Sequence, residues 1–153
     1  MSPTRVGHAD LYRSLNSRGA EYLVVGGIAC LLHGVPRTTK DLDLLVRRTA
    51  ENVERVLAAM QETGLGTATL ASVDEVLCHD ATIFKDRFRV DILTAIPGVE
   101  FEGAWRGRTG FTVAGINVPV LSLADLVRSK EATGRSSDLE DARLLRKIGG
   151  FRS

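Results

Sequence analysis

The sequence predicts a mixed α/β fold in which helices flank a central sheet that is mixed and largely antiparallel. Two patterns point to it: strand and helix signals alternate in the first third of the chain, and paired strand signals separated by short turns follow. A chain of 153 residues is long enough to bury roughly 68–70% of its unfolded surface around one core. We therefore expect a single domain over residues 1–153, with a short helical part at about 122–149.

The first half of the chain alternates helix and strand patterns. Leu11 and Leu15 recur at helical spacing, a short apolar run breaks off at Gly26-Gly27, and Thr49 is a typical N-cap residue. The elements expected here are, in order, a helix near 9–18, a strand at 22–25, a short helix at 28–33, a strand at 41–46 and an amphipathic helix from Thr49 to Gly64.

Two hairpins are expected in the second half of the chain. One joins strands at 81–84 and 88–93, and the other joins strands at 111–113 and 116–120. Pro119 lacks the N–H group that a central strand donates to its neighbour. The strand that carries it is therefore expected at an edge of the sheet.

Helix signals close the chain. The glycine-rich stretch 97–110 indicates a loop or a frayed helix, and its Trp105 is better explained as a partly buried anchor than as a base-stacking residue. Ser122 and Ser137 each begin a capping-box pattern, with an acidic residue three positions later. They are expected to start the two closing helices.

The composition argues against several classes of protein. Lys and Arg number 20 against 19 Asp and Glu, so the net charge of +1 creates no overall field that favours nucleic acid. The longest uncharged stretch, 22–36, is shorter than the roughly 20 apolar residues that a membrane-spanning helix needs. The N-terminus carries no signal-peptide pattern, and two cysteines form no disulfide framework. These features favour a reducing cytoplasm and no membrane association.

A zinc site is one alternative for the two cysteines. Cys30 with His33, and Cys78 with His79, supply side chains that zinc accepts, but their spacings match no usual zinc motif. Free cysteine is also among the most commonly buried residue types. We therefore favour a structural role for both.

The stretch 22–46 carries the most information about function. A strand that breaks at Gly26-Gly27 into a helix start presents free backbone N–H groups where glycine lets a ligand come close, which suits an anion. Neither a Walker loop nor the GxGxxG dinucleotide pattern is present. A turn that needs positive φ explains the glycines equally well, so other residues have to distinguish an anion-binding site from a purely structural turn.

Carboxylates supply that second observation. Asp41 and Asp43 lie two positions apart in an apolar strand, so both project from one face and repel each other. A divalent cation relieves this best, since Mg²⁺ is typically held by one or two carboxylates plus phosphate oxygens. The alternative is ordinary ion pairing with a neighbouring cation: Arg37, Lys40 or Arg47. Asp91 lies in another alternating strand, and if the two strands are neighbours, three carboxylates converge as ligands for two metal ions.

Together these residues resemble the signature of the polymerase-beta-like nucleotidyltransferase superfamily. In that signature a Gly-Gly or Gly-Ser pair precedes Asp-x-Asp/Glu, and a third acidic residue follows on a later strand. Here Gly26-Gly27, Asp41-x-Asp43 and Asp91 match it. The run from His33-Gly34 through Arg37-x-Thr39, with the stretch 130–141, is most similar to the small AbiEii-type and minimal nucleotidyltransferases of bacteria, many of which belong to toxin–antitoxin systems. The resemblance implies a nucleotidyltransferase-like fold.

The resemblance also implies a chemistry. Asp41, Asp43 and Asp91 would bind Mg²⁺ or Mn²⁺ and act in catalysis, with Asp91 helping to deprotonate an acceptor hydroxyl. That hydroxyl would attack the α-phosphate of a nucleoside triphosphate and release pyrophosphate. The residues implied in nucleotide binding are Gly26, Gly27, Arg37, Thr39, Lys130 and Arg135. Ile28 stands where many members use a serine to hold phosphates, so the hydroxyl would come from Thr38 or Thr39, or backbone amides would act alone.

Several of these residues have structural alternatives. Arg37 could pair with Asp41 rather than with a phosphate. Lys130 could be a solvated helix residue paired with nearby acids, and Arg135 a loop charge. Asp138 and Asp141 are better explained as helix-start residues that favour the positive end of the helix dipole than as catalysts.

The acceptor and the partners stay open at this point. The leading hypothesis is a macromolecular acceptor, RNA or protein, with a cognate toxin or antitoxin as a further partner. Transfer to a small hydroxyl compound such as an antibiotic is the first alternative, and a non-catalytic nucleotide-binding or partner-binding relative is the second. A chain of 153 residues leaves little room for a separate acceptor domain, so a second copy of the chain could hold the acceptor.

Overall fold

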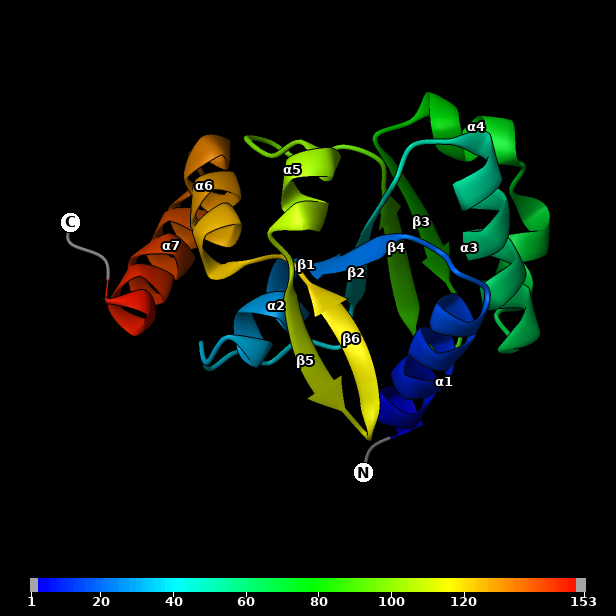
Figure 1. Cartoon of the computed structure of the whole chain (residues 1–153), viewed down its shortest axis with the longest axis horizontal. Coiled ribbons are helices and arrows are strands. Elements are labelled where there is room, and N and C mark those ends of the chain that lie inside the picture. The colour runs from blue at the N-terminus through cyan, green and yellow to red at the C-terminus, as the bar shows by residue number, and fades with distance from the viewer. Residues whose placement is uncertain (1–2, 151–153) are drawn as a thin grey trace.

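The computed structural model describes residues 3–150 and contains a six-stranded sheet with helices around it (Figure 1). In chain order the elements are α1 (Pro3–Ser17), β1 (Tyr22–Val25), α2 (Gly26–Leu32), β2 (Leu42–Val46), α3 (Ala50–Glu62), the 3-10 helix η1 (Gly66–Leu70), α4 (Val73–Cys78), β3 (Ala81–Lys85), β4 (Arg89–Leu93), α5 (Phe101–Arg106), β5 (Thr109–Val113), β6 (Ile116–Val120), α6 (Leu123–Thr133) and α7 (Ser136–Gly149).

The strands lie side by side in the order β3-β4-β2-β1-β6-β5. Pairing is antiparallel in β3–β4, β1–β2 and β5–β6, and parallel in β2–β4 and β1–β6. The predicted mixed, largely antiparallel sheet is therefore confirmed. In Figure 1, α1, α3 and α4 gather at one end of the molecule, and α6 and α7 lie against each other at the opposite end.

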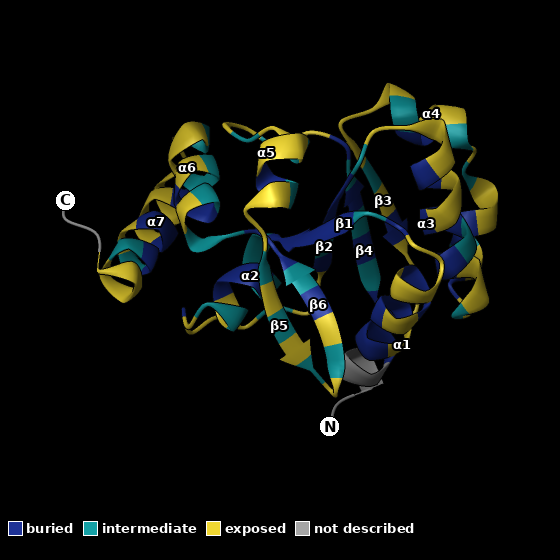
Figure 2. Ribbon diagram, viewed as in Figure 1, coloured by how far each residue is buried: buried dark blue, intermediate teal, exposed yellow. Residues whose placement is uncertain are grey.

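Two-residue alternation decides which side of each strand enters the core. Leu44 of β2 and both Val90 and Ile92 of β4 have no exposed surface, and Figure 2 shows β1 buried along its whole length. Burial of one such side chain contributes roughly 1.5–3 kcal/mol to folding. The intervening Asp43 and Asp91 consequently face the other side of the sheet.

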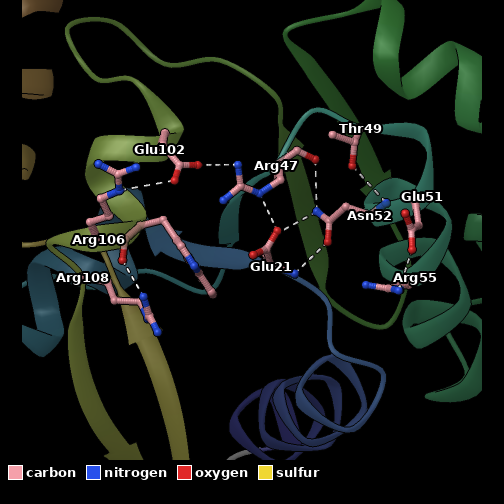
Figure 3. Close-up of polar contacts among 10 residues, drawn as sticks. Glu21, Arg47, Thr49, Glu51, Asn52, Arg55, Glu102, Arg106 and Arg108 are labelled. Atoms are coloured by element: carbon pink, nitrogen blue, oxygen red, sulfur yellow. Dashed lines mark hydrogen bonds and ion pairs between the residues drawn. The ribbon is translucent and has the colours of Figure 1, made fainter.

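Asn52 joins α3 to the ends of β1 and β2 (Figure 3). Its buried side chain accepts a hydrogen bond from the Glu21 N–H at 2.7 Å and donates to the carbonyls of Glu21 and Arg47 at 2.9 and 3.1 Å. Arg47 in turn forms ion pairs with Glu21 and Glu102. One amide thus satisfies three backbone groups where the chain enters β1 and leaves β2.

We expect Asn52→Ala to lower the free energy of unfolding by about 3 kcal/mol, because each buried backbone group left without a partner costs roughly 1–3 kcal/mol. Urea denaturation measures the change. The matched control on the same helix is Arg55→Ala, which removes only an exposed pair with Glu51 and is expected to cost less than about 0.5 kcal/mol. Equal effects of the two substitutions would contradict this account of Asn52.

A second buried polar side chain makes stability depend on pH. His8 on α1 is buried, its ring meets that of Phe88 edge-on at 4.7 Å between centroids, and its Nε2 atom has no hydrogen-bond partner among the described residues. Burial lowers the pKa of His8 to about 4. The imidazole is therefore neutral in the folded protein where an unfolded histidine is already protonated.

Between pH 6.5 and about 4 the unfolded chain binds a proton at His8 that the folded protein does not. The free energy of unfolding is therefore expected to fall by up to about 3 kcal/mol from this residue as the pH is lowered through that range. Urea titrations at pH 7 and pH 4.5 of the natural chain and of His8→Leu test this. The leucine variant should lose less stability on acidification, and an identical loss would show that His8 contributes nothing.

Most predicted elements are present with small shifts of their ends, and two predictions are wrong. β6 is not an edge strand, since it lies between β1 and β5. Pro119 is tolerated because only Val120 is in register with β1, so no ladder bond to β1 is needed at the proline. Ser137 does not cap α7, which begins at Ser136 with Arg135 at the N-cap and no side-chain cap. Ser122 does cap α6, as expected.

No helix or strand was expected between residues 64 and 81, where the structure has η1 and α4. A capping box formed by Ser72 and Glu75 starts α4 and could have indicated it. The stretch 97–110 contains the short helix α5, in which Trp105 stacks on Phe101 with centroids 5.7 Å apart. The Arg108 guanidinium lies 4.0 Å from the Trp105 ring centroid, which fits an anchoring role for the indole.

Candidate active site

One cleft of about 430 Å³ lies where β1 ends and brings residues from six parts of the chain together. It is lined by the turn into α2, the loop before β2, the strands β2 and β4, and the facing parts of α6 and α7. All nine sequence-predicted site residues line it: Gly26, Gly27, Arg37, Thr39, Asp41, Asp43, Asp91, Lys130 and Arg135. The cleft therefore has an acidic side on the sheet and a basic side on the helices.

The acidic side is built by two neighbouring strands. β2 and β4 pair in parallel with Asp43 directly opposite Asp91, while Asp41 immediately precedes β2. Burial, together with the charge of Asp91 and a hydrogen bond between the two carboxyls, raises the pKa of Asp43 to about 7. The charge of Asp41 acts in the same direction. Three carboxyl groups thus meet with too little compensating positive charge to keep all of them ionised easily.

The glycine turn lies directly against these carboxyls. Val25 is in register with Asp43, so the following Gly26 is in contact with the Asp43 side chain. Gly26 has φ +67°, and a Cβ there would overlap the Asp43 carboxylate far inside van der Waals distance. A Cβ on Gly27 would lie 3.2 Å from the hydroxyl of Thr39, which therefore sits beside the turn. Gly26 needs glycine both for this close approach and for its backbone conformation, whereas a side chain at position 27 would require Thr39 to shift slightly.

The basic side is a cluster of ion pairs that α6, α7 and the loop before β2 form around two buried aspartates. Lys130 contacts Asp138 at 3.0 Å and Asp141 at 3.1 Å, Arg135 contacts Asp138 at 2.8 Å, and Arg37 pairs with Asp141. Burial opposes the charge of Lys130, but hydrogen bonds to both aspartates outweigh it and raise its pKa. Three cations against two carboxylates leave one net positive charge on this side of the cleft.

These contacts correct two expectations. The partner of Arg37 is Asp141, not Asp41, because the loop before β2 runs against α7. Asp138 lies in the first turn of α7, as expected of a helix-start residue, and both Asp138 and Asp141 are buried and hold the cations of the cluster in place. Lys130 pairs with nearby acids, as its structural alternative had it, but it is mostly buried rather than solvated, with 14% of its side chain exposed.

Sequence reasoning missed Arg89, which meets the acidic side. Its guanidinium donates two hydrogen bonds to Asp91, at 2.8 and 3.1 Å, and lies 4.0 Å from Asp41. The signal was available, because residues 89 and 91 alternate onto the same face of one strand.

The carboxylates of the acidic side are suitable ligands for magnesium, although they do not by themselves complete its coordination shell. Within residues 3–150 no group of three or more His, Cys, Asp or Glu side chains is arranged to hold a metal ion. Carboxylate oxygens are nevertheless the ligands that Mg²⁺ prefers, and one or two of them suffice when phosphate oxygens complete the shell. Asp43 and Asp91 lie side by side, with Arg89 paired to Asp91 and no cation paired to Asp43 among the described residues, and they meet that requirement.

The architecture is a nucleotidyltransferase-like fold. A protein from Thermotoga maritima, described as a candidate nucleotidyltransferase, shares it with a TM-score of 0.55 at 18% identity, over 95% of this chain and 91% of that one. An antigenic nucleotidyltransferase-like protein from Paracoccidioides brasiliensis shares it with a TM-score of 0.55 at 15% identity, over 97% of this chain and 77% of that one.

Residues 9–146 match the family described as nucleotidyltransferase of unknown function, DUF6036, and the chain belongs to that family. No curated protein matches the sequence. None of the helices within residues 3–150 combines the length and the apolar character needed to cross a bilayer.

Proposed function

We propose that this chain is a metal-dependent nucleotidyltransferase that moves a nucleoside monophosphate from a nucleoside triphosphate to a hydroxyl group of RNA or protein. The observation that carries the proposal is the cleft in which Asp41, Asp43 and Asp91 face both a glycine turn and a cationic cluster. Its volume of about 430 Å³ lies in the range of small-molecule sites, roughly 300–1,000 Å³. A triphosphate brings negative charge that suits the cationic cluster, and its divalent cation brings positive charge that suits the three carboxyls.

The basic side would take the triphosphate. Lys130 keeps its charge despite burial because two carboxylates hold it, and Arg37 and Arg135 lie on the same wall. Their positions are set before any ligand arrives, so little side-chain ordering would oppose binding. The backbone N–H groups at Gly26 and Gly27 would add donors to phosphate oxygens, since no side chain caps the start of α2. The Thr39 hydroxyl beside Gly27 would replace the serine missing at Ile28.

The acidic side would take the metal ion and the acceptor. Asp41, Asp43 and Asp91 would hold Mg²⁺ or Mn²⁺. When bound, the ion supplies positive charge that stabilises the negative charge of the phosphoryl-transfer transition state. Asp91 would accept the proton of the acceptor hydroxyl, whose oxygen forms a bond to the α-phosphorus. The bond from that phosphorus to the oxygen of the β-phosphate breaks, and pyrophosphate leaves. The cationic wall would stabilise the negative charge of the leaving group.

Label transfer tests the proposal. The purified chain is incubated with Mg²⁺ or Mn²⁺ and each nucleoside triphosphate labelled at the α-phosphate, with total RNA and, separately, with cell protein as acceptors. Stable labelling of an acceptor, release of pyrophosphate and no labelling from γ-labelled nucleotide are expected. No transfer to any acceptor, together with no metal-dependent nucleotide binding, would contradict the proposal. Labelling of a small hydroxyl compound alone would replace the macromolecular acceptor with a small one.

The resemblance to AbiEii-type enzymes supports a further part of the proposal, a role in a toxin–antitoxin system in the reducing cytoplasm, where both free cysteines would stay reduced. Induced expression of the chain in a bacterial host should then arrest growth, and the Asp43→Asn chain should not. Growth unaffected by an active enzyme would remove the toxin role and leave the transfer activity intact.

A further inference from the structure

Arg89 is paired with Asp91, a carboxylate that the proposed reaction needs as a metal ligand and proton acceptor. Both oxygens of Asp91 accept hydrogen bonds from its guanidinium, at 2.8 Å from Nε and 3.1 Å from the second nitrogen. This two-pronged geometry is the strongest that an arginine and a carboxylate form. Asp91 is shielded, with 16% of its side chain exposed, and Arg89 engages both of its oxygens.

Arg89 is also the nearest positive charge to the whole acidic side. Among the described residues, only Arg89 places a cationic nitrogen within 4.0 Å of an oxygen of Asp41, Asp43 or Asp91. The cations Arg37, Lys130 and Arg135 are engaged with Asp138 and Asp141 across the cleft. One guanidinium therefore compensates part of the charge of three carboxyls, and it does so at the oxygens that a metal ion would bind.

The surroundings of Arg89 leave room for it to move away. Its side chain is 37% exposed, and in the β3–β4 pairing it lies opposite Lys85, whose side chain is exposed at the sheet edge. An arginine in this position exchanges its carboxylate for water at modest cost, whereas a buried arginine could not.

We propose that Arg89 is a positioning residue that neutralises Asp91 in the metal-free protein and has to release it before Asp91 can serve as a ligand. The proposal rests on the proposed function, because it assumes that the three carboxylates bind a divalent cation. Binding of the ion and pairing with Arg89 compete for the same two oxygens. Arg89 thereby keeps the acidic side folded without metal and weakens metal binding until nucleotide contributes its own phosphate oxygens.

Binding of Mn²⁺ to the nucleotide-free full chain tests the competition directly, by calorimetry and by electron paramagnetic resonance of free Mn²⁺. Arg89→Gln is expected to bind Mn²⁺ roughly tenfold more tightly, because the competing charge is gone. Its unfolding temperature should fall without metal and recover more strongly on addition of Mg²⁺ than that of the natural chain. Arg89→Lys keeps the charge but loses the two-pronged contact, and an intermediate affinity is expected.

Arg87→Gln is the matched control, since Arg87 lies in the turn of the same hairpin as Arg89, and its guanidinium donates to the Thr63 carbonyl at the end of α3 and to none of the three carboxylates. It should bind Mn²⁺ as the natural chain does. In an Asp91→Asn background, Arg89→Gln should raise the affinity less than it does in the natural chain, because the two-pronged contact is already absent.

Mn²⁺ affinity of Arg89→Gln equal to or weaker than that of the natural chain would overturn the role of Arg89 while leaving the metal site standing. If no chain binds Mn²⁺ even with nucleoside triphosphate present, both the role of Arg89 and the metal-dependent function fail. If Arg89→Gln does not fold, the Mn²⁺ affinity of Arg89→Lys tests the role of Arg89 instead. An affinity equal to that of the natural chain would overturn that role.

Discussion

Asp43→Asn is expected to lower the rate of nucleotidyl transfer by about a thousandfold or more and to leave the protein folded. Asp43 is the central carboxyl of the acidic side, directly opposite Asp91 on β4 and in contact with Gly26. Asparagine keeps its shape but removes the charge that would attract a divalent cation. The loss should therefore appear in transfer and in metal-dependent nucleotide binding together.

The stability of Asp43→Asn, unlike its activity, should not fall. Asp43 is partly buried beside two other carboxyls, and no cation lies within ion-pair distance of it among the described residues. Removal of its charge relieves repulsion, so the free energy of unfolding in the absence of metal should be unchanged or higher. Rates of label transfer, with thermal unfolding in parallel, measure both effects.

The control for this substitution is Asp10→Asn. Asp10 is exposed on α1 and pairs with Arg13, and it is absent from the lining of the cleft. Its asparagine variant should transfer label at the natural rate. Retention of the natural rate in Asp43→Asn within a few-fold would remove Asp43 from the catalytic residues.

Gly26→Ala should damage both folding and transfer. Gly26 has φ +67°, a conformation that costs an L-residue roughly 1–2 kcal/mol, and the added methyl would overlap the Asp43 carboxylate. We expect the free energy of unfolding to fall by about 2–4 kcal/mol. We also expect transfer to fall about a hundredfold or more, because Asp43 would be pushed away from Asp91.

Gly19→Ala separates the two causes. Gly19 has φ +69°, almost the same conformation, but a Cβ there would meet nothing within 4 Å. It therefore carries the backbone strain alone and should cost about 1 kcal/mol with transfer unchanged. Urea denaturation and label transfer of both variants measure the difference. If Gly26→Ala and Gly19→Ala lose the same stability and neither loses transfer, the contact between Gly26 and Asp43 has no functional role.

Local sequence patterns were enough to predict many of the residues that line the site. Asp41 and Asp43 could be assigned to one face because a strand alternates its side chains, and the Gly26-Gly27 break marked the turn at the end of a buried strand. The apolar positions that alternate with these aspartates are buried, as expected. Such features depend on neighbours within a few residues, which the order of amino acids states directly.

Other features depended on partners that are remote in the chain. Arg37 pairs with Asp141, 104 positions away, and not with the nearby Asp41. Pro119 lies in a strand between two others because only Val120 registers with β1. Arg89 was available from alternation, yet its role became visible only when its guanidinium was seen on Asp91.

The sequence by itself determined the periodicity of the strands, the glycine turn and the residue types that can bind a metal–triphosphate. The tertiary structure alone decided that β4 lies next to β2 in parallel, which sets Asp91 opposite Asp43. It also decided that α6 and α7 close the cleft with a cluster of ion pairs around Lys130 and two buried aspartates. The reason is physical: local backbone preferences act over a few residues, whereas strand order and buried ion pairs are chosen by the burial of the whole chain at once.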